Sequence, residues 1–114
     1  VAMPDEERAV IEAAPRRRRE ALRNTGWVRH TLESVTWGLL TTDSFEEALV
    51  QVVNLGMDAD TAGAVMGAVA GAAYGLSAIP TRWTRVLKGE WPLKSGDLWD
   101  AARFIDLADQ LMPA

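Results

Sequence analysis

Glycine recurs at every fourth position through an uncharged stretch in the second half of the chain. The four glycines are Gly63, Gly67, Gly71 and Gly75. Residues four apart lie on one face of an α-helix, so the spacing predicts a helix over 59–75 with a stripe that lacks side chains. Each glycine costs roughly 1 kcal/mol of helix stability relative to alanine. We therefore expect compensation from a close neighbour: the segment 30–41, the last helix of the chain or a second copy.

The same stretch could also be interpreted as a membrane helix. No charged residue occurs between Thr61 and Pro80, GxxxG is a dimerisation motif of membrane helices, and about 20 residues are enough to span a bilayer. Glycine and alanine dominate the stretch, however, and they contribute little transfer free energy. Two aspartates also stand at its start. We therefore favour a packed helix and expect no membrane partner.

Helical periodicity continues before the glycine stretch. Apolar residues follow helical spacing in the segments 30–41 and 44–54. Ser44 and Glu47 form the S-x-x-E pattern of a capping box at the start of the second segment. Gly56 follows that segment and is a candidate for the residue that closes it.

The two ends of the chain complete a helical prediction. A charged helix over 4–23 is interrupted by Pro15. A short helix is predicted over 81–88, and a last helix over 97–112 begins with Asp97 as its cap. No segment alternates apolar and polar residues with the period of two that a half-buried strand requires. The chain is therefore predicted to be all-α, an orthogonal array of helices without a sheet.

Length and composition are those of a single globular domain. The 114 residues are enough for one core, and 48% of them are hydrophobic. Within this domain we distinguish a charged extension over 1–25, a central region over 26–88, and a loop with a terminal helix over 89–114. The absence of cysteine excludes a disulfide framework and favours a reducing, cytoplasmic setting.

The negative charge is concentrated in the middle of the chain. The net charge is -4, and residues 25–60 contain six acids against one arginine. Bulk charge of this sign disfavours nucleic-acid binding, so no nucleic-acid partner is expected. A focused acidic site can instead bind a cation.

Two carboxylates and a hydroxyl cluster immediately before the glycine stripe, at Asp58, Asp60 and Thr61. Hard oxygen ligands suit Mg²⁺, Mn²⁺ or Ca²⁺ rather than zinc. The alternative is simple capping, in which Asp58 or Asp60 accepts backbone N–H groups and binds nothing. The spacing alone favours capping, because a bare D-x-D-T pattern is weak evidence for a metal.

The context of this pattern resembles the ADP-ribosylglycohydrolase family. The likeness runs in one register through T-L-E-S-V-T-W at 31–37, T-D-S-F-E-E-A at 42–48 and N-L-G-M-D-A-D-T-A-G-A at 54–64. It continues along the glycine stripe to Trp83, so it covers about residues 26–88. The family includes the enzymes that remove ADP-ribose from dinitrogenase reductase.

The resemblance implies a compact all-α fold with a binuclear Mg²⁺ or Mn²⁺ centre. By position, the family's D-x-D-T ligands would be Asp58, Asp60 and Thr61 here. The metals of the family hold the ribose hydroxyls of ADP-ribose and a water, and they assist cleavage at the anomeric carbon. No residue of this chain is assigned a catalytic role beyond these metal ligands.

The chain departs from the family pattern in two ways. Met57 stands where the family usually has glycine, and Ala62 stands where it often has a second threonine. Methionine would be strained there if the loop required a positive φ. In addition, the family's remaining ligands, a Thr-Asp-Asp run in an N-terminal half, have no counterpart in this sequence. We therefore expect weak or absent metal binding, and no hydrolysis, from this chain alone.

Three further features are interpreted as structural. The basic run Arg16–Arg19 is predicted to be a solvated helix face, although it could contact phosphate. His30 is the only histidine and has no readable catalytic partner. The five tryptophans are interpreted as core or interface anchors, and Trp83 or Trp91 could otherwise stack on an adenine.

These observations leave three functions in competition. The chain is part of an ADP-ribosyl hydrolase that needs the missing N-terminal half, or a non-catalytic helical protein of that family that binds itself or a partner. A bare metal-binding module is the third alternative. An uncovered apolar face predicts that the chain is not a free monomer, and a homodimer is the simplest closed arrangement. The rival arrangement is that the charged first helix folds back as a lid over this face. A ligand of the ADP-ribose type is expected only if the metal site is completed.

Overall fold

The computed structural model describes residues 2–113, which form two compact units. The first unit ends at Ala78 and the second begins at Ile79. Most of the described chain is helical, which confirms the predicted all-α class, although one small sheet is present. Among the described residues, no helix has the length and apolar character that a membrane span requires.

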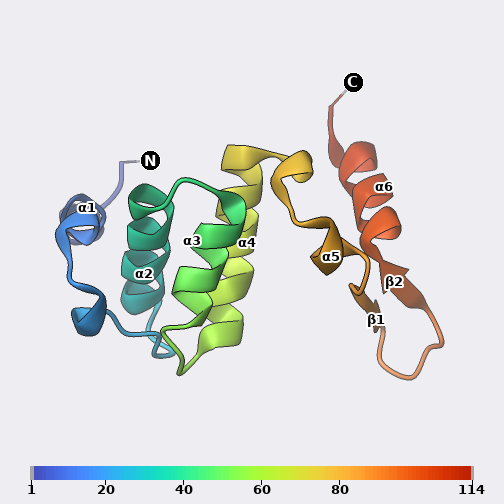
Figure 1. Cartoon of the computed structure of the whole chain (residues 1–114), viewed down its shortest axis with the longest axis horizontal. Helices are drawn as coiled ribbons and strands as arrows, with labels where there is room; N and C mark the ends of the chain where they lie inside the picture. The colour runs from blue at the N-terminus through green and yellow to red at the C-terminus, as the bar shows by residue number, and fades with distance from the viewer. Residues whose placement is uncertain (1, 114) are drawn as a thin grey trace. The chain divides into compact units, whose positions relative to one another are not determined.

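The first unit is built from α-helices (Figure 1). They are α1 at Asp5–Ala13, α2 at Val28–Thr41, α3 at Phe45–Val53 and α4 at Ala59–Tyr74. Short 3₁₀ turns accompany them at Ala14–Arg16, Arg19–Ala21 and Leu76–Ala78. Helices α2, α3 and α4 pack against one another, and α1 lies against α2. The three helices predicted in the central region are therefore confirmed.

The core of the first unit lies where α2, α3 and α4 meet. Its buried apolar residues are Val35, Phe45, Ala48, Val52, Ala62, Met66 and Ala70. A Cβ at Gly38 of α2 would come within 2.5 Å of the Val52 side chain and 2.7 Å of the Met66 side chain. Because Val52 and Met66 are themselves fully buried, the core leaves no room for that atom. Gly38 thus allows α2 to approach both other helices.

The glycine stripe of α4 faces α3 in part. A Cβ at Gly63 would lie 3.0 Å from Val53, and one at Gly71 would lie 4.0 Å from Phe45. At Gly67 the same atom would meet nothing within 4 Å in the described chain. Within this chain, the predicted close neighbour is therefore present only along part of the stripe, and it is α3 rather than the segment 30–41. The last stripe position, Gly75, has a φ of 82° and ends α4.

The capping box predicted for α3 is present with a small change. The Ser44 hydroxyl accepts a hydrogen bond from the Glu47 N–H at 3.1 Å. The Glu47 carboxylate accepts from the N–H of Asp43 at 3.2 Å, one residue before the serine. The two side chains together satisfy N–H groups at the start of the helix, as the pattern predicted.

The second unit contains α5 at Thr81–Thr84, a two-stranded sheet and α6 at Ala101–Leu111. The strands β1 at Lys88–Glu90 and β2 at Leu98–Asp100 are antiparallel. The prediction of no strand is therefore wrong. The short helix predicted over 81–88 begins at Thr81 as expected but ends at Thr84. Each strand has only three residues, which is too short for the alternation of apolar and polar positions to be visible.

The last helix begins at Ala101 because Asp100, and not Asp97, is its cap. The Asp100 carboxylate accepts a hydrogen bond from the Arg103 N–H at 2.9 Å. Asp97 pairs instead with the guanidinium of the same arginine. The predicted start at position 97 is therefore wrong, because the last residues before the helix belong to β2.

The basic run forms part of two 3₁₀ turns rather than one face of a helix. Arg17 Nε lies 3.0 Å from the carboxylate of Glu33 on α2. Arg19 donates to the carbonyl oxygens of Gln51 and Asn54, each at 3.1 Å. These oxygens lie at the C-terminal end of α3, where a cation is favourable. The prediction of a helix face is therefore wrong, and Arg19 stabilises the end of α3.

Candidate metal centre at the start of α4

A tight loop between α3 and α4 carries the acidic cluster. The loop turns at two residues with positive φ, Gly56 at 77° and Met57 at 55°. Met57 therefore has the strained backbone expected of a side chain at a position that favours glycine. The next residue is tied down, because the Asp58 N–H donates to the Asn24 carbonyl oxygen at 2.7 Å.

The carboxyl groups of Asp58 and Asp60 lie next to each other at the first turn of α4. Asp58 occupies the N-cap position, but its side chain makes no capping hydrogen bond. A hydrogen bond with the Asp58 carboxyl lowers the pKa of Asp60, and the N–H groups of Thr61 and Asp60 lower it further. Asp60 and Thr61 are exposed, whereas Asp58 is half-buried. The structure thus brings the two predicted carboxylate ligands together beside Thr61.

This set of oxygen donors fits a divalent cation. Two neighbouring carboxylates repel each other when both are charged, and a cation between them removes that repulsion. Oxygen ligands of this kind suit Mg²⁺ or Mn²⁺. The capping alternative does not apply to the Asp58 side chain, although Asp60 does interact with backbone N–H groups.

The cluster is too small to enclose a metal ion. Within residues 2–113, no group of three or more histidine, cysteine, aspartate and glutamate side chains could hold one. Asp58, Asp60 and Thr61 would leave the other positions of a six-coordinate ion to water or to further groups. Their role as ligands stays a prediction, and it describes part of a centre rather than a whole one.

Asn24 is a residue of this region that the sequence did not reveal. It is fully buried, and its side-chain Nδ2 donates to the Val52 carbonyl oxygen at 2.9 Å. The run Asn24-Thr25-Gly26 is typical of a chain reversal, so its composition gives no sign of a contact with α3 or α4. Only the folded chain places this side chain beside the loop of the acidic cluster.

His30 has contacts that support its structural interpretation. Its Nδ1 lies 2.7 Å from the hydroxyl oxygen of Thr25. Its ring meets the ring of Trp27 edge-on, with 4.8 Å between the ring centroids. These contacts hold the segment before α2 against the first turn of that helix.

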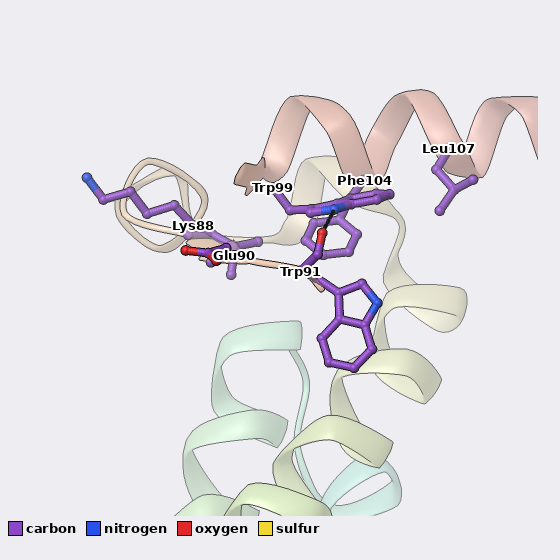
Figure 2. Close-up of a pocket in the computed structure, with 8 residues that line it drawn as sticks. Lys88, Glu90, Trp91, Trp99, Phe104 and Leu107 are labelled. Atoms are coloured by element: carbon purple, nitrogen blue, oxygen red, sulfur yellow. Dashed lines mark hydrogen bonds between the residues drawn. The ribbon is translucent and has the colours of Figure 1, made fainter. Parts of the chain in front are cut away.

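The second unit contains a hydrophobic pocket of about 500 Å³, shown in Figure 2. It is lined by Leu87, Lys88, Gly89, Glu90, Trp91, Trp99, Phe104 and Leu107. The Trp99 indole N–H donates to the Trp91 carbonyl oxygen at 3.2 Å, and the rings of Trp99 and Phe104 lie 5.2 Å apart. Trp91 is 66% exposed, so it is not a core residue of this unit, and its alternative role as an interface anchor stays a prediction. The pocket shares no residue with the candidate metal centre.

The fold is mostly helical, and two carboxylates and a hydroxyl lie at the start of one helix. These features are those of a candidate metal-dependent helical protein. The family model that describes ADP-ribosylglycohydrolases matches residues 2–114. The chain belongs to this family. The resemblance found over residues 26–88 is therefore confirmed and extends to nearly the whole sequence.

Three relatives show how much of a family member the chain represents. ADP-ribosylarginine hydrolase Tri1 of Serratia proteamaculans is 43% identical over 67 residues, which are 59% of this chain and 18% of the relative. The Tri1 of Pseudomonas putida is 32% identical over 96 residues, 82% of this chain and 26% of the relative. ADP-ribosyl-[dinitrogen reductase] glycohydrolase of Rhodospirillum rubrum is 42% identical over 60 residues, 53% of this chain and 20% of the relative.

The matched part of this chain thus spans between 18% and 26% of the length of these relatives. No solved structure matches the chain significantly.

Proposed function

We propose that the chain supplies one part of the metal centre of an ADP-ribosyl hydrolase. The observation that carries this proposal is the position of Asp58, Asp60 and Thr61 at the start of α4, in a chain that belongs to the ADP-ribosylglycohydrolase family. Two relatives are named as hydrolases of ADP-ribosylarginine, so we take ADP-ribosylarginine as the first substrate to test. The cysteine-free composition is compatible with a cytoplasmic setting.

The chemistry assigned to this chain is ligation and orientation. A bound Mg²⁺ or Mn²⁺ supplies Lewis-acid polarisation and lowers the pKa of a bound water. The carboxylates of Asp58 and Asp60 would hold such an ion, with the Thr61 hydroxyl beside them. No acid or base of this chain is assigned to proton transfer.

We expect the isolated chain to release no ADP-ribose from ADP-ribosylarginine or ADP-ribosylserine. Two carboxylates and a hydroxyl cannot by themselves fix a metal and a substrate in the geometry that hydrolysis needs. Metal-dependent turnover by the chain alone, abolished by Asp58→Ala, would contradict this expectation and show that the centre is complete.

A chimera tests the proposal directly. The matching segment of the Pseudomonas putida Tri1 is replaced by this chain, and release of ADP-ribose from ADP-ribosylarginine is measured with Mn²⁺. We expect activity that Asp60→Ala abolishes and that Asp106→Ala, an exposed acid on α6, leaves unchanged. A chimera that is folded by circular dichroism but inactive, beside an active unaltered Tri1, would refute the proposed role.

A second candidate function is self-association without catalysis. It is favoured by the glycine stripe of α4, where a Cβ at Gly67 would meet nothing within 4 Å in the described chain. Val65 and Val69, which are 40% and 37% exposed, lie on the opposite side of the same helix. On this alternative, a second copy of the chain would cover the glycine stripe, and the chimera would be inactive.

A further inference from the structure

Asn24 makes two hydrogen bonds that join separate parts of the first unit. Its side-chain Nδ2 donates to the Val52 carbonyl oxygen at 2.9 Å, near the end of α3. Its own carbonyl oxygen accepts from the Asp58 N–H at 2.7 Å, at the start of α4. Asn24 itself precedes α2 and is 0% exposed. One buried residue therefore contacts both sides of the loop that carries the acidic cluster.

Packing alone does not explain an asparagine at this position. Its Oδ1 is buried and has no hydrogen-bond partner among the described residues. A buried acceptor without a partner destabilises the fold. Turning the amide over would not help, because Oδ1 would then face the Val52 carbonyl, which is also an acceptor. A small apolar residue would avoid this cost, but it would lose the donor to α3.

The loop between α3 and α4 needs such a restraint. It contains two residues with positive φ, and Met57 adopts that conformation at a cost. Strained backbone persists only where surrounding contacts determine it. The bond to Asp58 is made directly after the strained residue, so it is placed to hold the loop in this conformation.

We propose that Asn24 is a positioning residue of the candidate metal centre. By holding the Val52 carbonyl and the Asp58 N–H, it fixes the backbone from which the Asp58 and Asp60 carboxylates project. The part of this inference that concerns a metal rests on the proposed function, whereas the restraint on the loop does not. Asn24 is not assigned any contact with a metal or a substrate.

Ser34→Ala is a matched control for Asn24→Ala. Ser34 is also 0% exposed, and its hydroxyl donates to the carbonyl oxygen of Arg23 at 3.2 Å. It therefore also donates a side-chain hydrogen bond to a backbone carbonyl, next to Asn24 in the chain, but this part-buried bond does not hold the α3–α4 loop. A loss of stability common to both variants is a structural effect, and an effect confined to Asn24→Ala is a positioning effect.

Three measurements on the full chain separate these effects. Hydrogen exchange reports the protection of the Asp58 amide relative to the amides in the middle of α4. Titration with Mn²⁺, followed by paramagnetic broadening of the amide signals of residues 58–61, reports the affinity of the acidic cluster even when binding is weak. Urea unfolding gives the overall stability of each variant.

Asn24→Ala is expected to speed exchange at Asp58 about tenfold relative to the middle of α4, as the loss of one buried hydrogen bond predicts. The Mn²⁺ concentration needed for half-maximal broadening is expected to rise about 10- to 100-fold, as when a residue that orients a metal ligand is removed. Ser34→Ala is expected to lower the urea midpoint without either change. Equal effects of the two variants on Asp58 exchange and on Mn²⁺ broadening would overturn the proposal.

The unaltered chain provides a second test that does not depend on a variant folding. A scalar coupling through the hydrogen bond, between the Asp58 amide nitrogen and the Asn24 carbonyl carbon, is expected, and its absence would overturn the proposal. If the unaltered chain shows no Mn²⁺ broadening at residues 58–61, the part of this inference that concerns a metal is overturned, whereas the proposed function is decided by the chimera. Exchange at Asp58 in Asn24→Ala then still decides whether Asn24 restrains the loop.

Discussion

Met57 adopts a left-handed backbone conformation that glycine adopts without strain. Its φ is 55°, and its side chain is 66% exposed, so little packing compensates for the strain. We predict that Met57→Gly raises the free energy of unfolding by about 1 kcal/mol, because relief of strain outweighs the added freedom of the unfolded chain. Urea unfolding measures the change. Met57→Ala removes the same side chain but keeps a Cβ, so it should give no such gain, and an equal gain from both variants would contradict the explanation.

Local residue patterns predicted part of this loop and missed the rest. The strain at Met57 was predicted because a methionine stands where the resembled family usually has glycine. The two carboxylates that follow it indicated the start of a helix. Arg19 and Asn24 could not be assigned in this way. Their partners on α3 lie 28 to 35 positions along the chain, and hydrogen bonds over such separations leave no local pattern.

At the scale of the helix, replacing a glycine by alanine is predicted to have opposite effects on stability in α2 and in α4. Gly38→Ala should destabilise the first unit by about 1–3 kcal/mol, because its Cβ would meet the stiff, buried Val52 side chain at 2.5 Å. Gly67→Ala should stabilise it by up to about 1 kcal/mol, because the position is open and alanine favours helix. Thermal or urea unfolding of the two variants checks both signs, and a stabilising Gly38→Ala would contradict the packing described for α2.

Helices with several periodic apolar residues or glycines could be predicted from the sequence. The position at which these helices pack most closely could not. Repeated glycines drew attention to α4, yet the glycine with the least space is Gly38, a single residue with no repeat around it. The two strands were missed for a related reason, since each contributes only three residues. Periodicity identifies the faces of long elements, and it carries no information on single contacts or very short elements.

Asp97, directly before β2, forms a charged pair with Arg103 of α6, and this pair should make the second unit sensitive to acid. Arg103 pairs with Asp97, donates to the Leu98 carbonyl oxygen at 3.0 Å, and stacks on Trp99 at 3.9 Å. The arginine lowers the pKa of Asp97. The folded state therefore favours the charged carboxylate, and its contribution is complete above the ordinary pKa of about 3.9 and lost as pH falls through the lower folded value.

We predict that the Trp99 indole N–H signal shifts as pH falls from about 5 to about 2, because the arginine beneath the ring loses its anionic partner. Nuclear magnetic resonance titration follows this signal. In Asp97→Asn the pair is absent, so the shift in this range should be lost. An identical titration in both proteins would show that Asp97 does not hold the arginine.

For the whole molecule, the open part of the glycine stripe of α4 predicts self-association. A Cβ at Gly67 would meet nothing within 4 Å in the described chain, so this position would admit a second helix close to its backbone. We propose that a second copy of the chain covers this surface, and sedimentation at micromolar concentration should show a dimer. A monodisperse species of 12.4 kDa would reject it.

Gly67→Leu tests where such a dimer forms. The position is open in the chain, so leucine should preserve the helix, as circular dichroism can confirm, while blocking close approach of a partner. Dimerisation should fall in this variant and remain unchanged in Ala9→Leu, which adds the same side chain at an exposed position of α1. A dimer that persists in Gly67→Leu would exclude the glycine stripe of α4 as its interface.

Calorimetric titration with Mn²⁺ tests most directly whether Asp58, Asp60 and Thr61 form only part of a metal centre. We predict that the isolated chain binds Mn²⁺ more weakly than micromolar, because three oxygen ligands leave most of the coordination shell to water. The weak heat of binding that remains should be lost in Asp60→Ala. A sub-micromolar dissociation constant that Asp60→Ala abolishes would contradict this prediction. That result would show that this chain, alone or as a dimer, already completes the site.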